Sequence, residues 1–354
     1  MKKTMFILIS LLLLGVLGVV ILFNYSTKGE NRENGFIRTF SGTKAILENS
    51  IRLMEDKYDF VGLQDKSILL YRLEKPYEII EIEYDLKKIK YRTLRIPTHI
   101  GDFKGVNTVR SYQDAFFLLN GKNGMAYKTG ENSKKNIARL DSNSFYHADL
   151  INSNSFLFMS SKYYQGINRR IVGKVNWKGT NRIDFMPEKQ IDGIFSTDGQ
   201  VKYDKPSNVI VYMFYFRGVF MCLDTNLKTI YQAKTIDTVK YARLTTTTTK
   251  LFYGKDTIQK TSTLGRPLLV NRRFCIFKEH IYIHSYLRAD NESPDEFGKS
   301  GTIDIYDLKT GKYLQSFHLP RVGNHKLSQF RIYKDKLVGL YGSQLAVFVI
   351  KYKN

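Results

Sequence analysis

Tyr84-Asp85-Leu86-Lys87-Lys88-Ile89-Lys90-Tyr91 returns later in the chain as Tyr306-Asp307-Leu308-Lys309-Thr310-Gly311-Lys312-Tyr313. Six of the eight positions are identical, and each copy leads into a segment rich in β-forming residues that ends at a proline, Pro97 or Pro320. Each copy places a polar turn between two apolar segments, which is typical of a strand–turn–strand unit. Because the phrase occurs in both halves of the chain, it indicates a repeat architecture.

Alternation of apolar and polar residues continues on both sides of each copy and predicts strands through most of the chain after residue 35. The predicted first strands of six units are Tyr58–Leu63, Asn107–Tyr112, Phe145–Ile151, Gln200–Asp204, Leu268–Phe277 and Gln329–Tyr333. The predicted second strands are Ser67–Arg72, Ala115–Asn120, Ser155–Ser160, Val209–Phe216, His280–Leu287 and Lys336–Tyr341. Units begin about 40 to 70 residues apart, which fits the length of a β-propeller blade with variable loops. The sequence therefore predicts an all-β fold, a β-propeller of six blades.

A seven-bladed ring is the alternative, because the two copies of the phrase lie 222 residues apart (306 minus 84). That separation equals four steps of about 55 residues or five of about 44. The segment that decides is Thr238–Thr263, which we expect to be an inserted hairpin rather than a degenerate blade.

Ring closure is predicted from two unpaired strands at the ends of the repeat region. The last unit ends after its third strand, Leu345–Lys351, while Gly35–Phe40 is a spare strand at the start. Pairing these N- and C-terminal strands would complete the last blade and remove two exposed sheet edges.

The N-terminal segment Met5–Phe23 contains nineteen residues and no charge. As a helix it would be about 28 Å long, close to the hydrocarbon thickness of a bilayer. Lys2 and Lys3 precede it, so the positive-inside rule puts the rest of the chain outside the cytoplasm. We expect an uncleaved signal anchor, that is, one transmembrane helix in the cytoplasmic membrane, with a cleaved signal peptide as the alternative. The predicted division is residues 1–23 anchor, 24–34 polar stalk and 35–354 extracytoplasmic (periplasmic) propeller domain.

The formal net charge of +22 arises from 55 Lys and Arg against 33 Asp and Glu. These cations are scattered along the predicted strands, whereas nucleic-acid-binding proteins concentrate them in a stripe or arm. A nucleic-acid partner is therefore not expected, while an anionic envelope component stays open as a partner.

The Tyr-Asp-Leu-Lys hairpins and the related Leu223-Asp224-Thr225-Asn226-Leu227 carry a resemblance over residues 35–354. The chain resembles β-propeller repeat proteins in general and, more loosely, uncharacterised membrane-anchored propeller-like proteins of bacteria. It lacks the Trp-Asp repeat, the Tyr-Trp-Thr-Asp repeat and the sialidase-type Asp box of better-defined families. The resemblance therefore implies the fold and carries over no function.

Few residues point to chemistry, and we predict no metal, no cofactor and no named catalytic residue. His280 and His284 have the spacing that binds zinc on a helix, but on a strand they would lie about 13 Å apart. The acidic loop Asp290–Glu296 lacks the order of a known calcium loop and is expected to be a solvated turn. Gly121–Gly124 is expected to be a hairpin turn rather than a phosphate-binding loop.

Two further pairs have both structural and functional interpretations. Cys222 and Cys275 lie on different strands of neighbouring units, so we expect two buried free thiols rather than a disulfide. Alternation places Arg272 and Arg273 on opposite faces of one strand, so one of them could reach the central channel, although a charged loop edge is the simpler interpretation.

The sequence thus favours a non-enzymatic, membrane-anchored propeller that serves as a binding or interaction scaffold for another protein or an envelope component. The alternative is a propeller-type hydrolase or lyase whose residues converge at the central channel, and a third possibility is the sensor arm of a membrane complex. Carboxylates or histidines that converge on the channel would favour the enzyme. An exposed apolar or aromatic patch on the rim would favour the scaffold.

Overall fold

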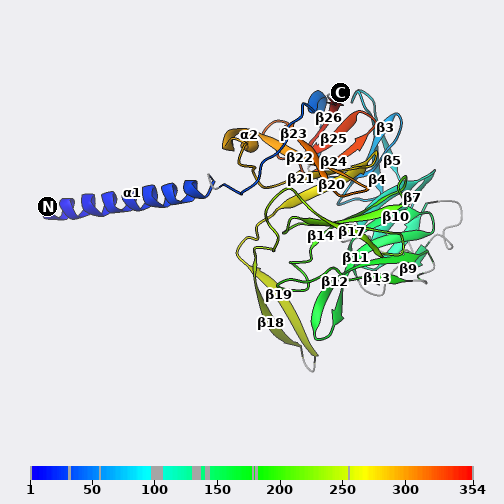
Figure 1. Ribbon diagram of the computed structural model, residues 1–354, viewed down its shortest axis with the longest axis horizontal. Helices are drawn as coiled ribbons and strands as arrows, with labels where there is room; N and C mark the ends of the chain where they lie inside the picture. The colour runs from blue at the N-terminus through cyan, green and yellow to red at the C-terminus, as the bar shows by residue number, and fades with distance from the viewer. Residues whose placement is uncertain are drawn as a thin grey trace.

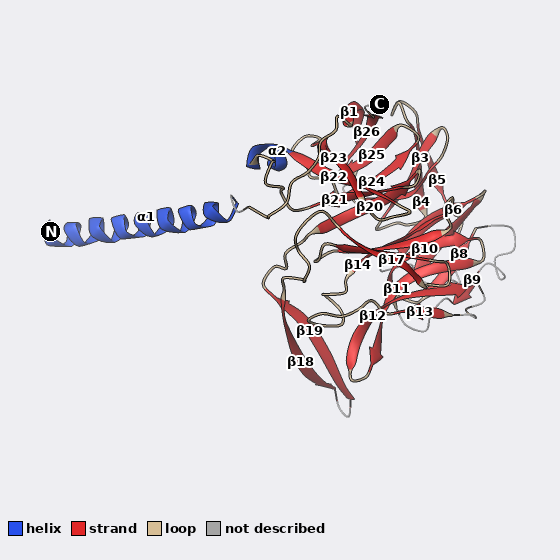
Figure 2. Cartoon of the chain, in the orientation of Figure 1, coloured by secondary structure: helices blue, strands red, loops and turns tan. Residues whose placement is uncertain are grey.

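The chain folds into a ring of six four-stranded antiparallel sheets preceded by a long helix (Figure 1). The computed structural model describes residues 2–30, 33–55, 57–96, 107–129, 137–139, 144–177, 179, 182–253 and 256–352. Strands dominate this part of the chain (Figure 2). The arrangement is a six-bladed β-propeller, as the sequence predicted, and the seven-bladed alternative is wrong.

The four strands of each blade follow one another from the ring axis outward, the innermost strand first. Blade 1 contains β2 (Tyr58–Leu63), β3 (Ser67–Arg72), β4 (Glu78–Glu83) and β5 (Ile89–Thr93). Blade 2 contains β6 (Asn107–Tyr112), β7 (Ala115–Asn120), β8 (Met125–Lys128) and β9 (Ile137–Arg139). Blade 3 contains β10 (Phe145–Asn152), β11 (Ser155–Tyr164), β12 (Ile167–Asn176) and β13 (Ile183–Phe185). Blade 4 contains β14 (Gly199–Asp204), β15 (Val209–Phe214), β16 (Val219–Leu223) and β17 (Thr229–Lys234). Blade 5 contains β20 (Asn271–Phe277), β21 (His280–Ser285), β22 (Ser300–Asp307) and β23 (Tyr313–Pro320). Blade 6 contains β24 (Gln329–Tyr333), β25 (Lys336–Tyr341), β26 (Gln344–Lys351) and β1 (Lys44–Arg52).

The hydrophobic core lies between neighbouring blades. Phe60 and Leu70 of blade 1 pack with Val347 of blade 6, and Phe220 of blade 4 packs with Phe274 of blade 5. Because the second strand of each blade is covered on both faces, it is apolar at most positions instead of alternating strictly. The strand β3 illustrates this, with five of its six residues buried.

The repeated sequence phrase forms the turn between the third and outermost strands of a blade. Leu86 follows β4, Leu308 follows β22, and Leu227 occupies the corresponding turn after β16; all three are buried in the core between two blades. The preceding aspartates accept backbone hydrogen bonds that hold the turn, as from Lys87 N to Asp85 Oδ1 at 3.0 Å. The repeat is therefore a turn that supplies its own core residue.

Ring closure occurs through a different strand from the one predicted. β1 pairs antiparallel with β26, from Lys44 opposite Lys351 to Arg52 opposite Gln344. The predicted closing segment Gly35–Phe40 contains no strand, so that prediction is wrong. The physical reason is Arg38, whose side chain is held inside blade 5 and keeps this segment away from β26.

The segment between blades 4 and 5 forms a separate two-stranded hairpin, β18 (Thr245–Tyr253) and β19 (Asp256–Leu264). It projects from the ring (Figure 1), which confirms the predicted insertion within Thr238–Thr263. A short helix, α2 (Pro294–Lys299), lies in the connection between β21 and β22.

The N-terminal helix α1 runs from Lys2 to Glu30, so helix continues into the polar segment expected to be a stalk at residues 24–34. Its apolar part, Lys3–Leu22, is long enough to span a membrane or to serve as a signal sequence. The division into anchor, stalk and domain at residues 1–23, 24–34 and 35–354 otherwise stays a prediction.

The segment after α1 is fixed to blade 5 by a buried cluster of charges around Arg38. Its guanidinium donates to Asp304 on β22, with Nε 2.7 Å from Oδ1, and it forms an ion pair with Glu292. A third donor, Nη2, lies 2.7 Å from Ser285 Oγ. Burial lowers the pKa of Arg38, but Asp304 and Glu292 raise it more, so the guanidinium stays charged. We call Arg38 with these three partners the Arg38 clamp.

Removal of the clamp cation gives a testable prediction. Arg38→Met leaves two buried carboxylates without their counter-charge, so we expect the free energy of unfolding to fall by about 3–5 kcal/mol. Chemical denaturation of the full chain in a non-ionic detergent measures this change. Arg52 is exposed on β1, so Arg52→Met is a matched control that should change it by less than about 0.5 kcal/mol. Equal decreases in the free energy of unfolding for the two variants would contradict a stabilising role of the Arg38 clamp.

Candidate functional site

The innermost strands of all six blades line a cavity of about 250 Å³ at the ring axis. We call it the channel mouth. Its lining residues are Asp59, Arg110, Tyr146, His147, Asp198, Gly199, Gln200, Tyr215, Arg273, Gln329 and Arg331. Convergence follows from the topology, because the inner edge of every blade faces the same axis.

The carboxylates at the channel mouth already have partners. Asp149 on β10 accepts from the lining residue Arg110, with 2.8 Å between Arg110 Nε and Asp149 Oδ1. Burial raises its pKa, but Arg110 and Arg331 lower it more, so the net pKa is below the ordinary value. Asp59 accepts from the backbone N–H of Phe60 at 2.6 Å and from the Tyr71 hydroxyl at 3.3 Å.

A third carboxylate, Asp198, lies 3.0 Å from the guanidinium of Arg170. Arg170 also stacks on Tyr146, with 4.1 Å between its guanidinium carbon and the ring centroid. Burial raises the pKa of Asp198 in spite of this cation. All three carboxylates are thus held by donors of the protein itself.

His147 is the histidine of the channel mouth, and it is neutral near pH 7. Its Nε2 lies 3.1 Å from the carbonyl oxygen of Val201, which can only accept, so we assign the proton to Nε2. Burial and then the charge of Arg110 lower its pKa to about 4.

Two cations near the ring axis form no close ion pair, although the carboxylate of Asp149 acts on both at longer range. Lys202 is 7% exposed, and Arg331 lines the cavity from β24; neither forms a hydrogen bond or an ion pair with any residue that the structure describes. The Lys202 ammonium lies 5.3 Å from the ring centroid of Phe274. Burial and then Arg331 lower the pKa of Lys202 well below its ordinary value.

The charge balance of the site follows from these contacts. Three cationic side chains (Arg110, Arg273 and Arg331) and two carboxylates (Asp59 and Asp198) line the cavity, and Arg170, Lys202 and Asp149 interact with these residues from outside the lining. Two of the arginines, Arg110 and Arg170, are ion-paired with Asp149 and Asp198. The arrangement can accept an anionic group, which would satisfy donors that the protein leaves open.

Of the two neighbouring arginines singled out in the sequence, Arg272 and Arg273, the structure places one in this site. Arg273 lines the channel mouth and donates to Ser328 O at 3.2 Å and to the Tyr215 hydroxyl at 3.2 Å. Arg272 points elsewhere, toward the Tyr286 hydroxyl at 2.5 Å, so alternation separates the two as expected.

The other candidate residues from the sequence lie outside the channel mouth. His280 and His284 occupy opposite ends of β21, and no group of three metal-binding side chains occurs among the described residues. Cys222 and Cys275 are buried free thiols, as predicted. The prediction of a solvated turn at Asp290–Glu296 is wrong for Glu292, which is buried because it pairs with Arg38.

Sequence reasoning missed Arg110, His147, Asp149, Lys202 and Arg331. A signal for them exists, because every predicted first strand carries charged or histidine side chains among apolar neighbours. Such residues in an otherwise apolar inner strand can reach only the axis or a buried partner.

The ring and its axial site place this chain in the class of β-propeller proteins. No protein-family model matches the chain, and no curated protein matches it significantly. Among solved structures, a member of the DUF4221 family from Bacteroides vulgatus is similar over 88% of this chain and 99% of its own, with 13% identity and a TM-score of 0.53. At that identity the similarity concerns the fold alone.

Two further similarities fall below a TM-score of 0.5. The WD40 domain of Pan2 from Neurospora crassa has 9% identity and a TM-score of 0.45, covering 90% of this chain and 99% of its own. Virginiamycin B lyase from Staphylococcus aureus has 10% identity and a TM-score of 0.45, covering 87% and 99%.

The depressed pKa of His147 predicts a loss of stability in acid. Above pH 6.5 the imidazole is neutral in both states; below it, only the unfolded chain takes up the proton until the pH reaches about 4. Because the ring borders an open cavity, we expect the free energy of unfolding to fall by at most about 3 kcal/mol from this group. His147→Gln should flatten the profile between pH 6.5 and 4, measured by denaturation at each pH.

The exposed His325 provides the control. His325→Gln should leave the acid slope as in the unsubstituted chain. Parallel profiles for the His147 variant and the unsubstituted chain would contradict a neutral, buried imidazole at this position.

Proposed function

We propose that this protein is a membrane-anchored, extracytoplasmic β-propeller that binds another protein or an anionic envelope component at its channel mouth. The observation that carries the proposal is that Arg331, which lines the cavity, and Lys202, which lies on β14 within the electrostatic field of Arg331, form no ion pair with any residue that the structure describes. A buried cation without a partner is costly, and a bound carboxylate or phosphate would offset that cost.

The position of the channel mouth relative to the tether supports a role at the membrane. Gly199, Arg273 and Gln329 lie at or near the first residues of β14, β20 and β24. In blade 5 that end of the sheet also carries the connection from β21 to β22, since Asn271 pairs with Ser285.

The tether docks on this same connection. Asn34 donates its backbone N–H to Asp290 Oδ1 at 2.7 Å, and Arg38 N donates to Asn291 Oδ1 at 3.0 Å. Helix α1 ends at Glu30, and four residues span at most about 14 Å. α2, the hairpin β18–β19 and the departing α1 share this side of the ring (Figure 1). The proposed orientation therefore turns the channel mouth toward the membrane, with the propeller in the periplasm.

A second candidate function is a propeller-type hydrolase or lyase, and one observation favours it: Asp59 and His147 line the same axial cavity, and Asp149 pairs with Arg110, which also lines it. Their contacts favour binding instead. A general acid or base needs a free proton site with a pKa near the working pH. His147 has its proton engaged with Val201 and a pKa of about 4, while Asp149 is paired with Arg110.

Cross-linking in intact membranes tests the proposed binding. We expect the unsubstituted chain to recover one defined partner or envelope polymer, and the double variant Lys202→Met with Arg331→Gln to recover about tenfold less or lower, because two charged contacts are lost. The control changes the same net charge at exposed positions, Lys312→Gln with Arg52→Gln. Equal recovery with both double variants would contradict binding at the channel mouth.

Mapping of the mature N-terminus tests the anchor. We expect purified membranes to contain a chain that starts before Met5 and that resists extraction by carbonate or high salt, because burial of the apolar helix does not depend on charge. A mature N-terminus beyond Phe23 would contradict the uncleaved anchor without affecting the binding proposal.

A further inference from the structure

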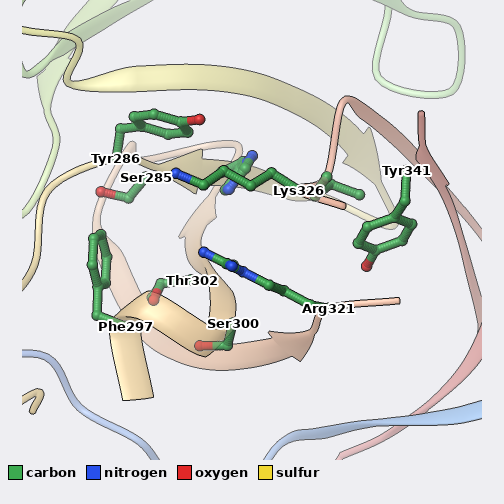
Figure 3. Close-up of a pocket in the computed structure, with 11 residues that line it drawn as sticks. Ser285, Tyr286, Phe297, Ser300, Thr302, Arg321, Lys326 and Tyr341 are labelled. Atoms are coloured by element: carbon green, nitrogen blue, oxygen red, sulfur yellow. The ribbon is translucent and has the colours of Figure 1, made fainter. Parts of the chain in front are cut away.

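A second cavity lies between blades 5 and 6, beneath α2, and none of its lining residues lines the channel mouth. Its volume is about 70 Å³, and we call it the α2 pocket. Figure 3 shows Ser285, Tyr286 and Phe297 on one side and Arg321 and Lys326 reaching toward them across the cavity. We propose that the α2 pocket binds a small organic acid, through a carboxylate carried on a short apolar body.

The first argument is charge. Arg321 and Lys326 come from the connection between β23 and β24 and extend in the same direction (Figure 3). Neither forms a hydrogen bond or an ion pair within the described part of the chain, and no carboxylate lines the pocket. Two parallel cations that face one cavity repel each other, so an anion between them is favourable.

The nearest acidic groups do not supply that anion. Glu292 and Asp304 lie behind the pocket wall, and both are ion-paired with Arg38 in the Arg38 clamp. The clamp also prepares a donor for the pocket. Because Arg38 Nη2 donates to Ser285 Oγ at 2.7 Å, the hydroxyl proton of Ser285 is free to point at a ligand.

A buried histidine provides an independent observation. His284 is 4% exposed and lines the pocket, and its Nδ1 has no hydrogen-bond partner among the described residues. Burial, then Arg272 and Arg273, lower its pKa to about 3, so the ring is neutral. Gly301 faces it without a side chain; a Cβ there would lie 3.2 Å from Nε2. The Nε2 edge of the imidazole therefore lies beside Gly301, and both residues line the pocket.

The remaining walls of the pocket are apolar, and they indicate that the rest of the ligand is apolar too. Tyr286 and Phe297 form one wall, while Leu327 and Tyr341 line the other end. Phe297 belongs to α2, which lies over the cavity and has no buried residue of its own. A volume of about 70 Å³ admits a carboxylate with a body of a few carbon atoms, and the apolar walls favour such a body over inorganic phosphate.

Calorimetric titration of the full chain in a non-ionic detergent tests the proposal with butyrate as the probe. We expect saturable binding of butyrate, with affinity lower by about tenfold or more for butyramide, which has the same shape without the charge. Acetate, which keeps the charge and shortens the apolar body, should also bind more weakly. Equal affinity for butyramide would overturn the anion site, and equal affinity for acetate or phosphate would overturn the apolar half of the proposal.

Variants then place the binding in this cavity. Arg321→Gln should abolish measurable butyrate binding, and Arg321→Lys should retain part of it, which separates lost charge from lost fold. Lys312 is exposed outside the pocket, so Lys312→Gln is the charge-matched control and should bind as the unsubstituted chain does. Butyrate binding that survives Arg321→Gln would overturn the proposal, as would an unsubstituted chain that does not bind butyrate.

Discussion

The pairing of β1 with β26 is the constraint on which the rest of the structure depends. These strands stand at opposite ends of the propeller region, yet they pair in one antiparallel ladder in blade 6, with a register shift between Leu47 and Asn49. Without this pairing, blade 6 would contain three strands and β26 would present a free sheet edge. Bringing the two ends of such a long chain together has an entropic cost, but this cost grows only slowly with the number of residues between them. One ladder of hydrogen bonds and the hydrophobic core beneath it therefore offset the cost of closure. Phe348 and Ala346 of β26 lie in that core together with Ala45 of β1.

Closure also fixes where charge can be placed. Once six inner strands surround one axis, polar side chains on them meet residues of blades that are distant in sequence. Arg110 of blade 2 meets Asp149 of blade 3, and Arg331 of blade 6 contributes to the electrostatic field at Lys202 of blade 4. A hydrophobic side chain at Lys202 would fill the site at lower cost in desolvation. Lys202 therefore costs the fold desolvation free energy that an apolar residue would not, and burial lowers its pKa well below the ordinary value.

Much of the fold could be predicted from the sequence because blade strands and their turns are local. The turn at Leu86 depends on its own Asp85 and on the immediate core, so a short phrase identified it. The closing strand could not be predicted, since neither Gly35–Phe40 nor Lys44–Arg52 alternates regularly between apolar and polar residues. The choice between them depends on the contact of Arg38 with Asp304, which joins residues separated by more than half of the chain.

The sites were less predictable for the same reason. Both the channel mouth and the α2 pocket bring together segments that are distant in sequence, so spacing carries little signal of them. A charge within an apolar inner strand marks an axial residue, but it does not say which blades lie opposite. Arg321 and Lys326 carried even less signal in the sequence, because cations on a loop are usually solvated surface residues. Only the folded structure shows that they line a pocket together with a residue of α2.

The order of the first attachments along the chain has a mechanical consequence. Starting from α1, the chain meets the contacts of Asn34 and Arg38 with blade 5 before it reaches β1 in blade 6. A pulling force applied through α1 would therefore act first on the Arg38 clamp, and the ladder of β1 with β26 would bear no load while the clamp holds. The clamp thus isolates the closing strand of the ring from any tension in the segment that precedes it.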